Sequence, residues 1–363
     1  MLRDSSSADS RTSAPTAPAT TPAAAARPRF SAVARQVVRV DADTLVRRQT
    51  SDEAARPPVT IEPAVDGLDL LDWATTHRDA VLADLRKAGC VLFRGFHIDS
   101  SAAFERVATE LCKPLYTDYG DLPDAAVGAK VYGSTPYPED RSILFHNESS
   151  HLSSWPKTMC FCCIQPSEWG GETPVVDCRQ VHARLDAPLR GEFERKGLRY
   201  VRNFVPGFDV HWRQFFRTDD RAAVEDQCRR AGMTCEWWGD DCLRTVQPRS
   251  AVTVHPDTGE KIFFNQILLH HLSCLDPIAR DALLADFAPG ELPRDVSFGD
   301  GTPIPDAAVD AVQQACDRAA RAFAWERGDV LMVDNMLVAH SRSPYRGARR
   351  ILVAMGDMVH QTA

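Results

Sequence analysis

The chain has 363 residues, of which 44% are hydrophobic, so it can form one large domain or two smaller ones. Its 42 Lys and Arg residues are outnumbered by 50 Asp and Glu residues, and the formal net charge is -8. Nucleic-acid-binding proteins usually carry an excess of basic residues that neutralises phosphates, so this composition argues against a nucleic-acid partner. No apolar run reaches the roughly 20 residues of a membrane-spanning helix, and no secretory h-region follows Met1. We therefore expect a cytoplasmic protein without a membrane partner.

The N-terminal stretch, residues 1–57, has few periodic apolar positions. It is rich in Ser, Ala, Thr and Pro, and it ends at the Arg56-Pro57-Pro58 segment. Such a composition cannot bury enough apolar surface to fold by itself. From Val59 onward no segment resembles a linker. We expect a disordered or loosely ordered arm over 1–57 and a single domain over 58–363.

The first part of this domain predicts a helix, a strand and a second helix. Apolar residues over 71–85 share one helical face, and Gly89 is a suitable stop. The apolar run 90–93 predicts a buried strand. Ser100 or Ser101 can cap the second helix, whose apolar residues follow an i, i+3, i+4, i+7 pattern.

The middle of the chain is rich in short apolar or alternating runs, which are separated by Gly, Pro and Asp clusters. These runs predict strands over 143–145, 158–164, 173–177, 198–204 and 261–264. Helices are expected after Asp220, after Asp276 and over 309–323, and strands return over 330–333 and 350–358. Many short strands with inserted helices indicate a fold that is mainly β with helices, namely a double-stranded β-helix (jelly roll) core with helical insertions.

A histidine and a glutamate stand two positions apart, just after the strand over 143–145. Side chains at i and i+2 of a strand point to the same face, so His146 and Glu148 can approach one ion while Asn147 points away. Two imidazoles and one carboxylate on one face of an octahedron leave three open positions, which suits non-haem iron(II). The pair by itself is a weak signal, because a surface pair or a salt bridge gives the same pattern.

Three features farther along the chain strengthen the metal hypothesis. His340 follows an apolar strand and a turn, although a histidine in such a place is usually a core residue. Arg349 and Arg350 begin the last strand, where neighbouring side chains face opposite sides. One arginine should therefore point into the barrel, where an unpaired cation is unfavourable and a dicarboxylate would pair with it; alternatively, both reach solvent. Thr173 offers a hydroxyl donor after the turn at 170–171.

Taken together, these segments resemble the taurine dioxygenase (TauD/TfdA) family within the clavaminate-synthase-like superfamily. The similar segments are 91–96 (VLFRGF), 146–148 (HNE), 170–174 (GGETP), and His340 followed by Arg349 and Arg350. Four further segments resemble a SyrP-like branch of the family: 149–151 with 155–156, 200–203, 255–260 (HPDTGE) and 263–266 (FFNQ).

The resemblance implies an oxidoreductase, a dioxygenase that uses iron(II), 2-oxoglutarate and dioxygen. It assigns iron ligation to His146, Glu148 and His340, and 2-oxoglutarate binding to Thr173 and Arg350. Arg350 would hold the distal carboxylate of 2-oxoglutarate, and Arg349 would then face away.

Two departures from the family pattern narrow the expected reaction. Many members carry Asp where this chain has Glu148, whereas related halogenases carry Gly or Ala there, so the resemblance implies hydroxylation rather than halogenation. The taurine enzymes place a second arginine, which binds the sulfonate, four residues after the 2-oxoglutarate arginine. This chain has Ala354 there, which argues against a sulfonate substrate.

The SyrP-like segments imply hydroxylation of an amino acid, either free or tethered to a carrier protein, in natural-product (antibiotic) biosynthesis. Desaturation or cyclisation of a small molecule by the same class of oxygenase is an open alternative. Two other classes are a zinc hydrolase with the same triad, which has no use for an inward-facing arginine, and a catalytically silent jelly-roll binding protein. Assembly into a homo-oligomer is left open.

Overall fold

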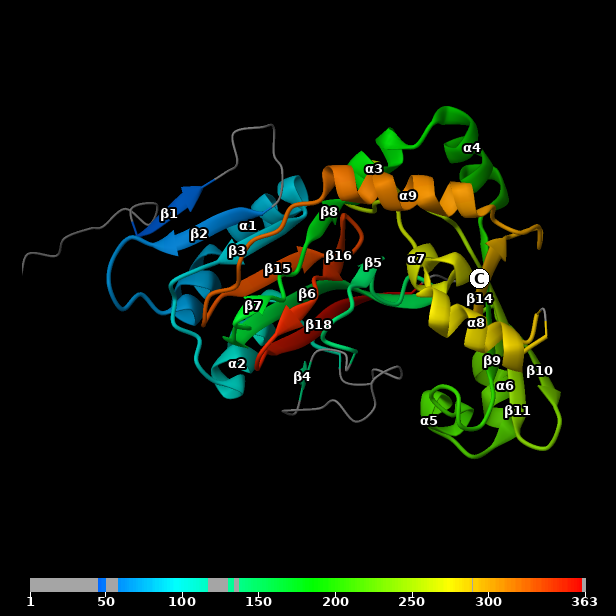
Figure 1. The fold of residues 1–363 in the computed structure, drawn as a ribbon. Helices are drawn as coiled ribbons and strands as arrows, with labels where there is room; N and C mark the ends of the chain where they lie inside the picture. The colour runs from blue at the N-terminus through cyan, green and yellow to red at the C-terminus, as the bar shows by residue number, and fades with distance from the viewer. Residues whose placement is uncertain (1–44, 50–57, 117–129, 134–136, 289, 361–363) are drawn as a thin grey trace, which may run out of the picture. The chain divides into compact units, whose positions relative to one another are not determined.

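Two β-sheets face each other in this protein, and helices cover their outer sides (Figure 1). The computed structural model describes residues 45–49, 58–116, 130–133, 137–288 and 290–360, all within one compact unit over Asp41–Ala363. The larger sheet has the strand order β1 (Val46–Gln49), β2 (Val59–Pro63), β3 (Cys90–Phe93), β15 (Val330–Asp334), β6 (Ser154–Gln165), β18 (Arg350–His360) and β4 (Tyr132–Gly133). The smaller sheet has the order β5 (Ile143–His146), β16 (Val338–Arg342) and β8 (Val175–Asp177).

The remaining strands form one further sheet and two strand pairs. A four-stranded sheet has the order β10 (Thr234–Trp238), β11 (Cys242–Arg249), β9 (Leu198–Phe204) and β14 (Arg294–Phe298). The two pairs are β12 (Val252–Val254) with β13 (Lys261–Phe263) and β17 (Tyr345–Arg346) with β7 (Trp169–Gly170). All pairings are antiparallel except that of β2 with β3. The expected fold, mainly β with a jelly-roll core and helical insertions, is confirmed.

Helices fill the connections between these strands. Their bounds are α1 (Leu70–Ala88), α2 (Ser101–Leu111), α3 (Cys178–Arg184), α4 (Ala187–Lys196), α5 (Trp212–Phe216), α6 (Arg221–Arg230), α7 (Ile267–His270), α8 (Pro277–Asp286) and α9 (Asp306–Ala319), with a 3-10 turn over Leu272–Cys274. None of these helices is long and apolar enough to cross a membrane.

The expected start and stop signals work as helix caps. The Ser100 hydroxyl accepts a hydrogen bond from the Ala103 amide and begins α2. Gly89 ends α1 in the left-handed conformation, with φ 81°, and donates its amide to the Leu85 carbonyl. An added Cβ at Gly89 would lie 2.4 Å from a methyl group of Val338, so the close approach of α1 to β16 also requires glycine.

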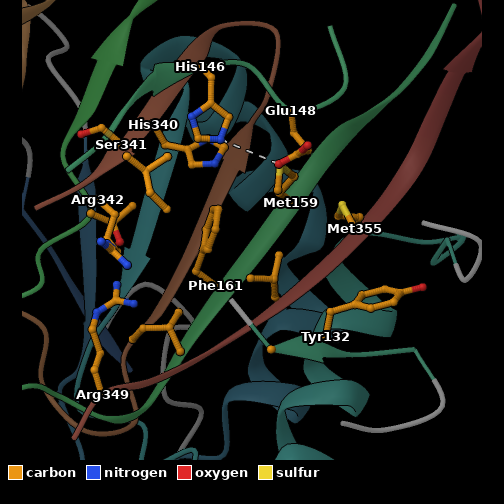
Figure 2. A pocket seen from close by; sticks show the side chains of 15 residues that line it. Tyr132, His146, Glu148, Met159, Phe161, His340, Ser341, Arg342, Arg349 and Met355 are labelled. Atoms are coloured by element: carbon orange, nitrogen blue, oxygen red, sulfur yellow. Dashed lines mark ion pairs between the residues drawn. The ribbon is translucent and has the colours of Figure 1, made fainter. Parts of the chain in front are cut away.

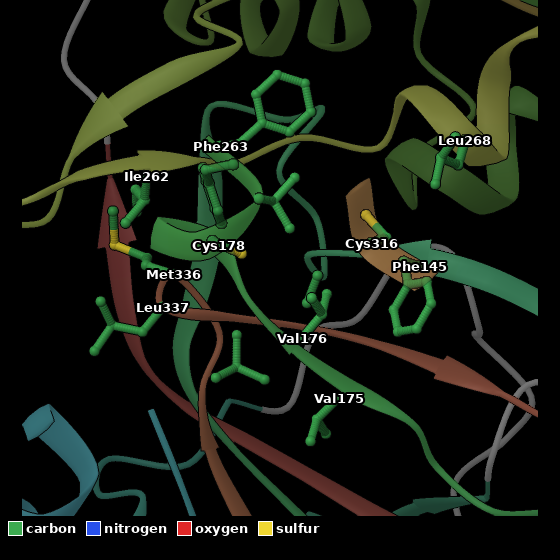
Figure 3. Close-up of a cluster of buried hydrophobic side chains, with 14 of the residues drawn as sticks. Phe145, Val175, Val176, Cys178, Ile262, Phe263, Leu268, Cys316, Met336 and Leu337 are labelled. Atoms are coloured by element: carbon green, nitrogen blue, oxygen red, sulfur yellow. The ribbon is translucent and has the colours of Figure 1, made fainter. Parts of the chain in front are cut away.

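The larger sheet is buried on both faces, and alternate residues of its strands belong to different cores. On β15, Leu331 and Val333 join the core that lies toward the smaller sheet, whereas Val330 and Met332 join the core under α1 and α2. Figure 3 shows part of the first core, to which Val175 and Val176 of β8 and Phe145 of β5 belong. Both faces of the central strands are therefore apolar.

The expected N-terminal arm lies mostly outside the described residues, since 1–44 and 50–57 are not among them. Within the expected arm, Val46–Gln49 forms β1 and pairs with β2, with Val46 opposite Pro63. The division into an arm over 1–57 and a domain over 58–363 stays a prediction.

Candidate metal centre

The smaller sheet brings the two candidate histidines together. His340 on β16 lies directly opposite His146 on β5 in the strand register, and the centres of their rings are 4.3 Å apart. Glu148 follows β5, with its Oε2 atom 3.9 Å from His146 Nε2 (Figure 2). Each residue offers one ligand atom, and these atoms lie within 4.8 Å of one another. Among the described residues, this is the one such group of three or more side chains.

Hydrogen bonding orients one of the two histidines, and burial sets the charge of the other. His146 Nδ1 lies 2.8 Å from the Leu144 carbonyl, which can only accept, so this nitrogen carries a proton and Nε2 is the atom on the side of Glu148. Burial, with a contribution from His146, holds the pKa of His340 well below its usual range, so the ring is neutral. His340 Nδ1 is buried without a hydrogen-bond partner among the described residues.

The main chain of Glu148 is fixed by a buried asparagine. Its amide donates to Asn335 Oδ1 at 2.6 Å, and its carbonyl accepts from Asn335 Nδ2 at 2.9 Å. Asn147 points away from the candidate ion, because its Nδ2 atom donates to the Asn335 carbonyl at 2.7 Å. The side chain of Glu148 is thus presented from a fixed backbone, which reduces the reorganisation needed on metal binding.

An inner cavity of about 80 Å³ lies between the two sheets, with the candidate metal ligands at one end (Figure 2). The guanidinium groups of Arg342 and Arg349 lie at the other end, near each other. Glu148 is the one carboxylate among the residues that line this cavity. The lining is Tyr132, Gly133, Ile143, His146, Glu148, Met159, Phe161, Thr173, His340, Ser341, Arg342, Arg349, Ile351, Val353 and Met355.

The structure places the arginine pair the other way round from the expectation. Arg349 lines the cavity, whereas Arg350 is exposed and does not. The expectation that Arg350 faces the 2-oxoglutarate site and that Arg349 faces away is therefore wrong. The reason is the alternation of side chains along β18 and the residue before it: Arg349, which precedes β18, shares a side with Ile351 and Val353, and all three line the cavity.

The same alternation changes which residue stands where the taurine enzymes have their sulfonate-binding arginine. Ala354 belongs to the core under α1 and α2, so it does not face the cavity. The position four residues after Arg349 is Val353, which does line it. A second arginine is absent there too, so the argument against a sulfonate substrate does not depend on which arginine faces inward.

A hydrogen bond to Gly171 holds the guanidinium of Arg349 in place, and burial lowers its pKa. Arg349 Nε donates to the Gly171 carbonyl at 3.0 Å, and a Cβ at Gly171 would lie 3.0 Å from this nitrogen. No described carboxylate lies within ion-pair distance of Arg349, and burial, with the nearby charge of Arg342, lowers its pKa to about 10. Arg349 is thus a partly buried cation without a counter-ion among the described residues, which favours an anionic ligand.

Arg342 is a cavity residue that sequence reasoning did not identify. It is buried, and its guanidinium donates to the carbonyls of Tyr137, Pro138 and Arg141. Its Nε atom is buried without a partner among the described residues. The signal that could have found it is its spacing from His340, because residues two apart on a strand share a face.

Thr173 lies where the sequence placed it, at the cavity wall. It is buried, and its hydroxyl oxygen accepts a hydrogen bond from Trp325 Nε1 at 3.1 Å. Because a hydroxyl accepts and donates at once, its proton remains available to a ligand.

A second, outer cavity of about 530 Å³ adjoins the inner one. The two share Ile143, His146 and Glu148, so the candidate metal centre lies at their junction. The outer cavity is lined by both apolar and charged groups: Tyr137, Arg141, Ser142, Ile143, Leu144, His146, Glu148, His151, Gln266, Leu268, Leu269, Cys274, Leu275, Asp276 and Arg294. Arg141 and Asp276 form an ion pair at its wall.

Comparisons with known proteins agree with this geometry. The model of the family described as "Taurine catabolism dioxygenase TauD, TfdA family" matches residues 50–355. The dapdiamide synthesis protein DdaC of Enterobacter agglomerans is 38% identical over 280 residues, which cover 77% of this chain and 85% of DdaC. A clavaminate synthase-like protein of Arabidopsis thaliana is 31% identical over 283 residues, covering 75% of this chain and 82% of that protein.

Solved structures support the fold. The crystal structure of PvcB from Pseudomonas aeruginosa matches with a TM-score of 0.52 at 13% identity, over 86% of this chain and 91% of PvcB. The candidate residues also fit the expected groups, since two imidazoles and a carboxylate suit iron(II) and the partly buried Arg349 suits a dicarboxylate. The chain therefore belongs to the TauD/TfdA family of oxygenases, which use iron(II), 2-oxoglutarate and dioxygen.

Proposed function

We propose that this oxygenase hydroxylates an unactivated C–H bond of an amino acid, either free or tethered to a carrier protein, in natural-product biosynthesis. The observation that carries the proposal is the junction of the two cavities at His146 and Glu148. The inner cavity has the size and charge for the cosubstrate, and the larger outer cavity holds the substrate. DdaC, whose name places it in dapdiamide synthesis, supports a biosynthetic role.

In this proposal His146, Glu148 and His340 hold the iron. Arg349 binds the distal carboxylate of 2-oxoglutarate, Thr173 donates its hydroxyl proton to the same cosubstrate, and Arg342 adds positive charge at that end. When bound, iron(II), 2-oxoglutarate and dioxygen supply the oxidation of the substrate, and 2-oxoglutarate is converted to succinate and carbon dioxide. The apolar walls at Phe161 and Val353 keep water from the space between the two ends.

The outer cavity offers groups that suit an amino-acid substrate. Asp276 provides a negative charge for an ammonium group, and Arg141 provides a positive charge for a carboxylate or carbonyl oxygen. Leu268 and Leu269 offer an apolar surface for a side chain or for the arm of a carrier protein. A free and a tethered substrate differ at the carboxyl group, where the tethered form has lost its charge.

Desaturation or cyclisation of the substrate by the same site is the second candidate reaction. Membership of an oxygenase family favours it over a zinc hydrolase or a silent binding protein. The closer resemblance to a SyrP-like branch stays a prediction.

The proposal is tested by succinate release from the purified protein with iron(II), 2-oxoglutarate and dioxygen. Free amino acids and the same aminoacyl groups loaded on a carrier protein are compared in parallel, with His340→Ala, which lacks a metal ligand, as the inactive control. We expect one of the two substrate forms to raise succinate release above the substrate-free rate. A product heavier by one oxygen atom confirms hydroxylation, whereas a product lighter by two hydrogens indicates desaturation or ring closure. If neither form raises succinate release, the proposed substrate class is wrong.

A further inference from the structure

The segment 255–260 (HPDTGE), singled out by the sequence, contributes no residue to the inner or the outer cavity. We propose that His255 is a positioning residue for the metal ligand Glu148, on which it acts through Asp334 and Asn335. The inference rests on the proposed iron site, and it extends that site by three buried residues that contact neither the ion nor the substrate in our account.

His255 is completely buried, and its hydrogen bonds fix the position of its proton. Its Nδ1 atom accepts from the amides of Asp257 at 3.3 Å and Thr258 at 3.2 Å. Because an accepting nitrogen carries no proton, the proton of the neutral ring lies on Nε2. This nitrogen donates to Asp334 Oδ2 at 3.0 Å. The ring thus connects the turn at 255–260 to the end of β15.

Asp334 passes this contact on to the turn between β15 and β16. Its other oxygen, Oδ1, accepts from the amides of Met336 at 2.9 Å and Leu337 at 3.1 Å. The Asp334 amide donates to the Gly89 carbonyl at 2.8 Å. Both carboxylate oxygens are therefore occupied, and the His255 bond determines how the carboxylate is oriented toward the turn.

Asn335, within the same turn, directly contacts the metal-binding segment, by which we mean residues 146–148. It is fully buried, and its side chain bonds both the amide and the carbonyl of Glu148, at 2.6 Å and 2.9 Å. It also donates to the Pro156 carbonyl at 2.8 Å. A shift of the turn at 334–337 must therefore move the backbone from which Glu148 reaches the ion. The turn also leads into β16, which carries His340.

If His255 had a purely structural role, its substitution should affect metal affinity differently. Such a histidine stabilises the fold but leaves metal affinity unchanged at temperatures where the protein is folded. His271 offers a matched control: it is buried, its Nδ1 accepts from the Ser273 amide at 3.3 Å, and its Nε2 donates to the Ile304 carbonyl at 3.0 Å. None of these partners bonds the metal-binding segment.

Two substitutions test the hydrogen bonds of the two His255 ring nitrogens one at a time. In His255→Asn the side-chain oxygen can take the place of Nδ1 and accept from the turn amides, but the side chain is too short to reach Asp334. In His255→Gln the terminal amide can take the place of Nε2 and donate to Asp334, but the acceptor for the turn is displaced. His271→Asn is made as the control.

The full-length protein and its variants are titrated with Mn(II), and free Mn(II) is followed by electron paramagnetic resonance. Thermal unfolding of each metal-free protein is measured separately. We expect His255→Asn to weaken Mn(II) binding by about 10–100-fold, the range seen when groups that orient metal ligands are removed. His255→Gln should bind Mn(II) more tightly than His255→Asn, and His271→Asn should keep the affinity of the unsubstituted protein even if it melts earlier.

Unchanged Mn(II) affinity in a folded His255→Asn protein overturns the inference, as does an equal loss in His271→Asn. Should His255→Asn fail to fold, Asp334→Asn tests the same link, because its new NH2 group opposes the proton on His255 Nε2. Weaker Mn(II) binding by Asp334→Asn supports the inference, and unchanged binding overturns it. Failure of the unsubstituted protein to bind Mn(II) would overturn the proposed iron site itself, which separates that outcome from failure of the His255 inference alone.

Discussion

The two ends of the inner cavity are built in different ways. At the metal end, His146 and His340 face each other across neighbouring strands, and the backbone of Glu148 is held by Asn335. At the arginine end, Arg349 has no counter-ion in the part of the chain that the structure describes, and burial lowers its pKa to about 10. The first end is preorganised for a cation and the second lacks only an anion. A cavity with these two ends suits a ligand that binds a metal at one end and carries a negative charge at the other.

The largest expected effect is at the metal end. His340→Ala removes one of the three ligands, and we expect iron(II) affinity to fall by about 100-fold or more. Removing a residue that only orients a metal ligand lowers metal affinity by up to about 100-fold, so loss of the ligand itself should cost at least as much. Equilibrium binding of iron(II) without oxygen measures the change. His182→Ala, on α3 and paired with Glu194, is the control and should bind normally. Normal binding by the His340→Ala protein would contradict the assignment of this ligand.

The arginine end should respond only to the inward-facing arginine. Arg349→Ala removes a charge-assisted, double hydrogen bond worth about 3 kcal/mol, so 2-oxoglutarate affinity should fall by about 100-fold. Arg350→Ala changes the neighbouring residue on the same strand and should leave this affinity unchanged, because Arg350 is exposed. The KM for 2-oxoglutarate checks both. The opposite pattern would restore the sequence-based assignment of Arg350.

A smaller effect at the same end is expected from Gly171→Ala. The added Cβ would lie 2.4 Å from the Ser167 hydroxyl and 3.0 Å from Arg349 Nε, and Gly171 has a φ of 75°. Displacement of Arg349 should weaken 2-oxoglutarate binding by about 10-fold, less than its removal. Iron(II) binding, measured on the same protein, should not change, because the metal end is held by other contacts. A loss of iron(II) binding would show that the two ends are not independent.

The smallest effect is expected in the outer cavity. Arg141→Ala breaks the ion pair with Asp276, whose members are partly exposed, so little stability should be lost. Once a substrate is found, its KM should rise by about 10-fold while the KM for 2-oxoglutarate stays the same. Equal changes in both would place Arg141 at the cosubstrate instead of the substrate.

The sequence predicted the metal end better than the arginine end, and strand geometry explains why. His146 ends β5 and Glu148 follows it by two residues, so their closeness in the chain already brings them near each other. Arg349 and Arg350 begin a strand that is buried on both faces over 351–356, so the apolar pattern gives no sign of which face is the cavity. The register also shifts between Arg350 and Ile351. Which arginine faces inward therefore depends on tertiary pairing.

The fold was predictable where caps and apolar periodicity agree. The strand over Cys90–Phe93 matches its predicted range, and the helix over Ser101–Leu111 begins after Ser100, one of the two predicted caps. The strand pair Thr234–Trp238 and Cys242–Arg249 was not expected. No residue of the first strand is buried, and two of the three buried residues of the second, Thr245 and Gln247, are polar, so the apolar alternation of a strand is weak. Arg342 was missed as well, since its role depends on the carbonyls of a distant loop at 137–141.

The central claim is that one ligand joins the metal bound by His146, Glu148 and His340 to Arg349. A crystal structure of the protein soaked with iron(II) and 2-oxoglutarate in the absence of oxygen tests this most directly. We expect an ion bonded to all three side chains and a 2-oxoglutarate molecule whose distal carboxylate contacts Arg349. An ion bound elsewhere, or a cosubstrate that contacts Arg350 and not Arg349, would contradict it.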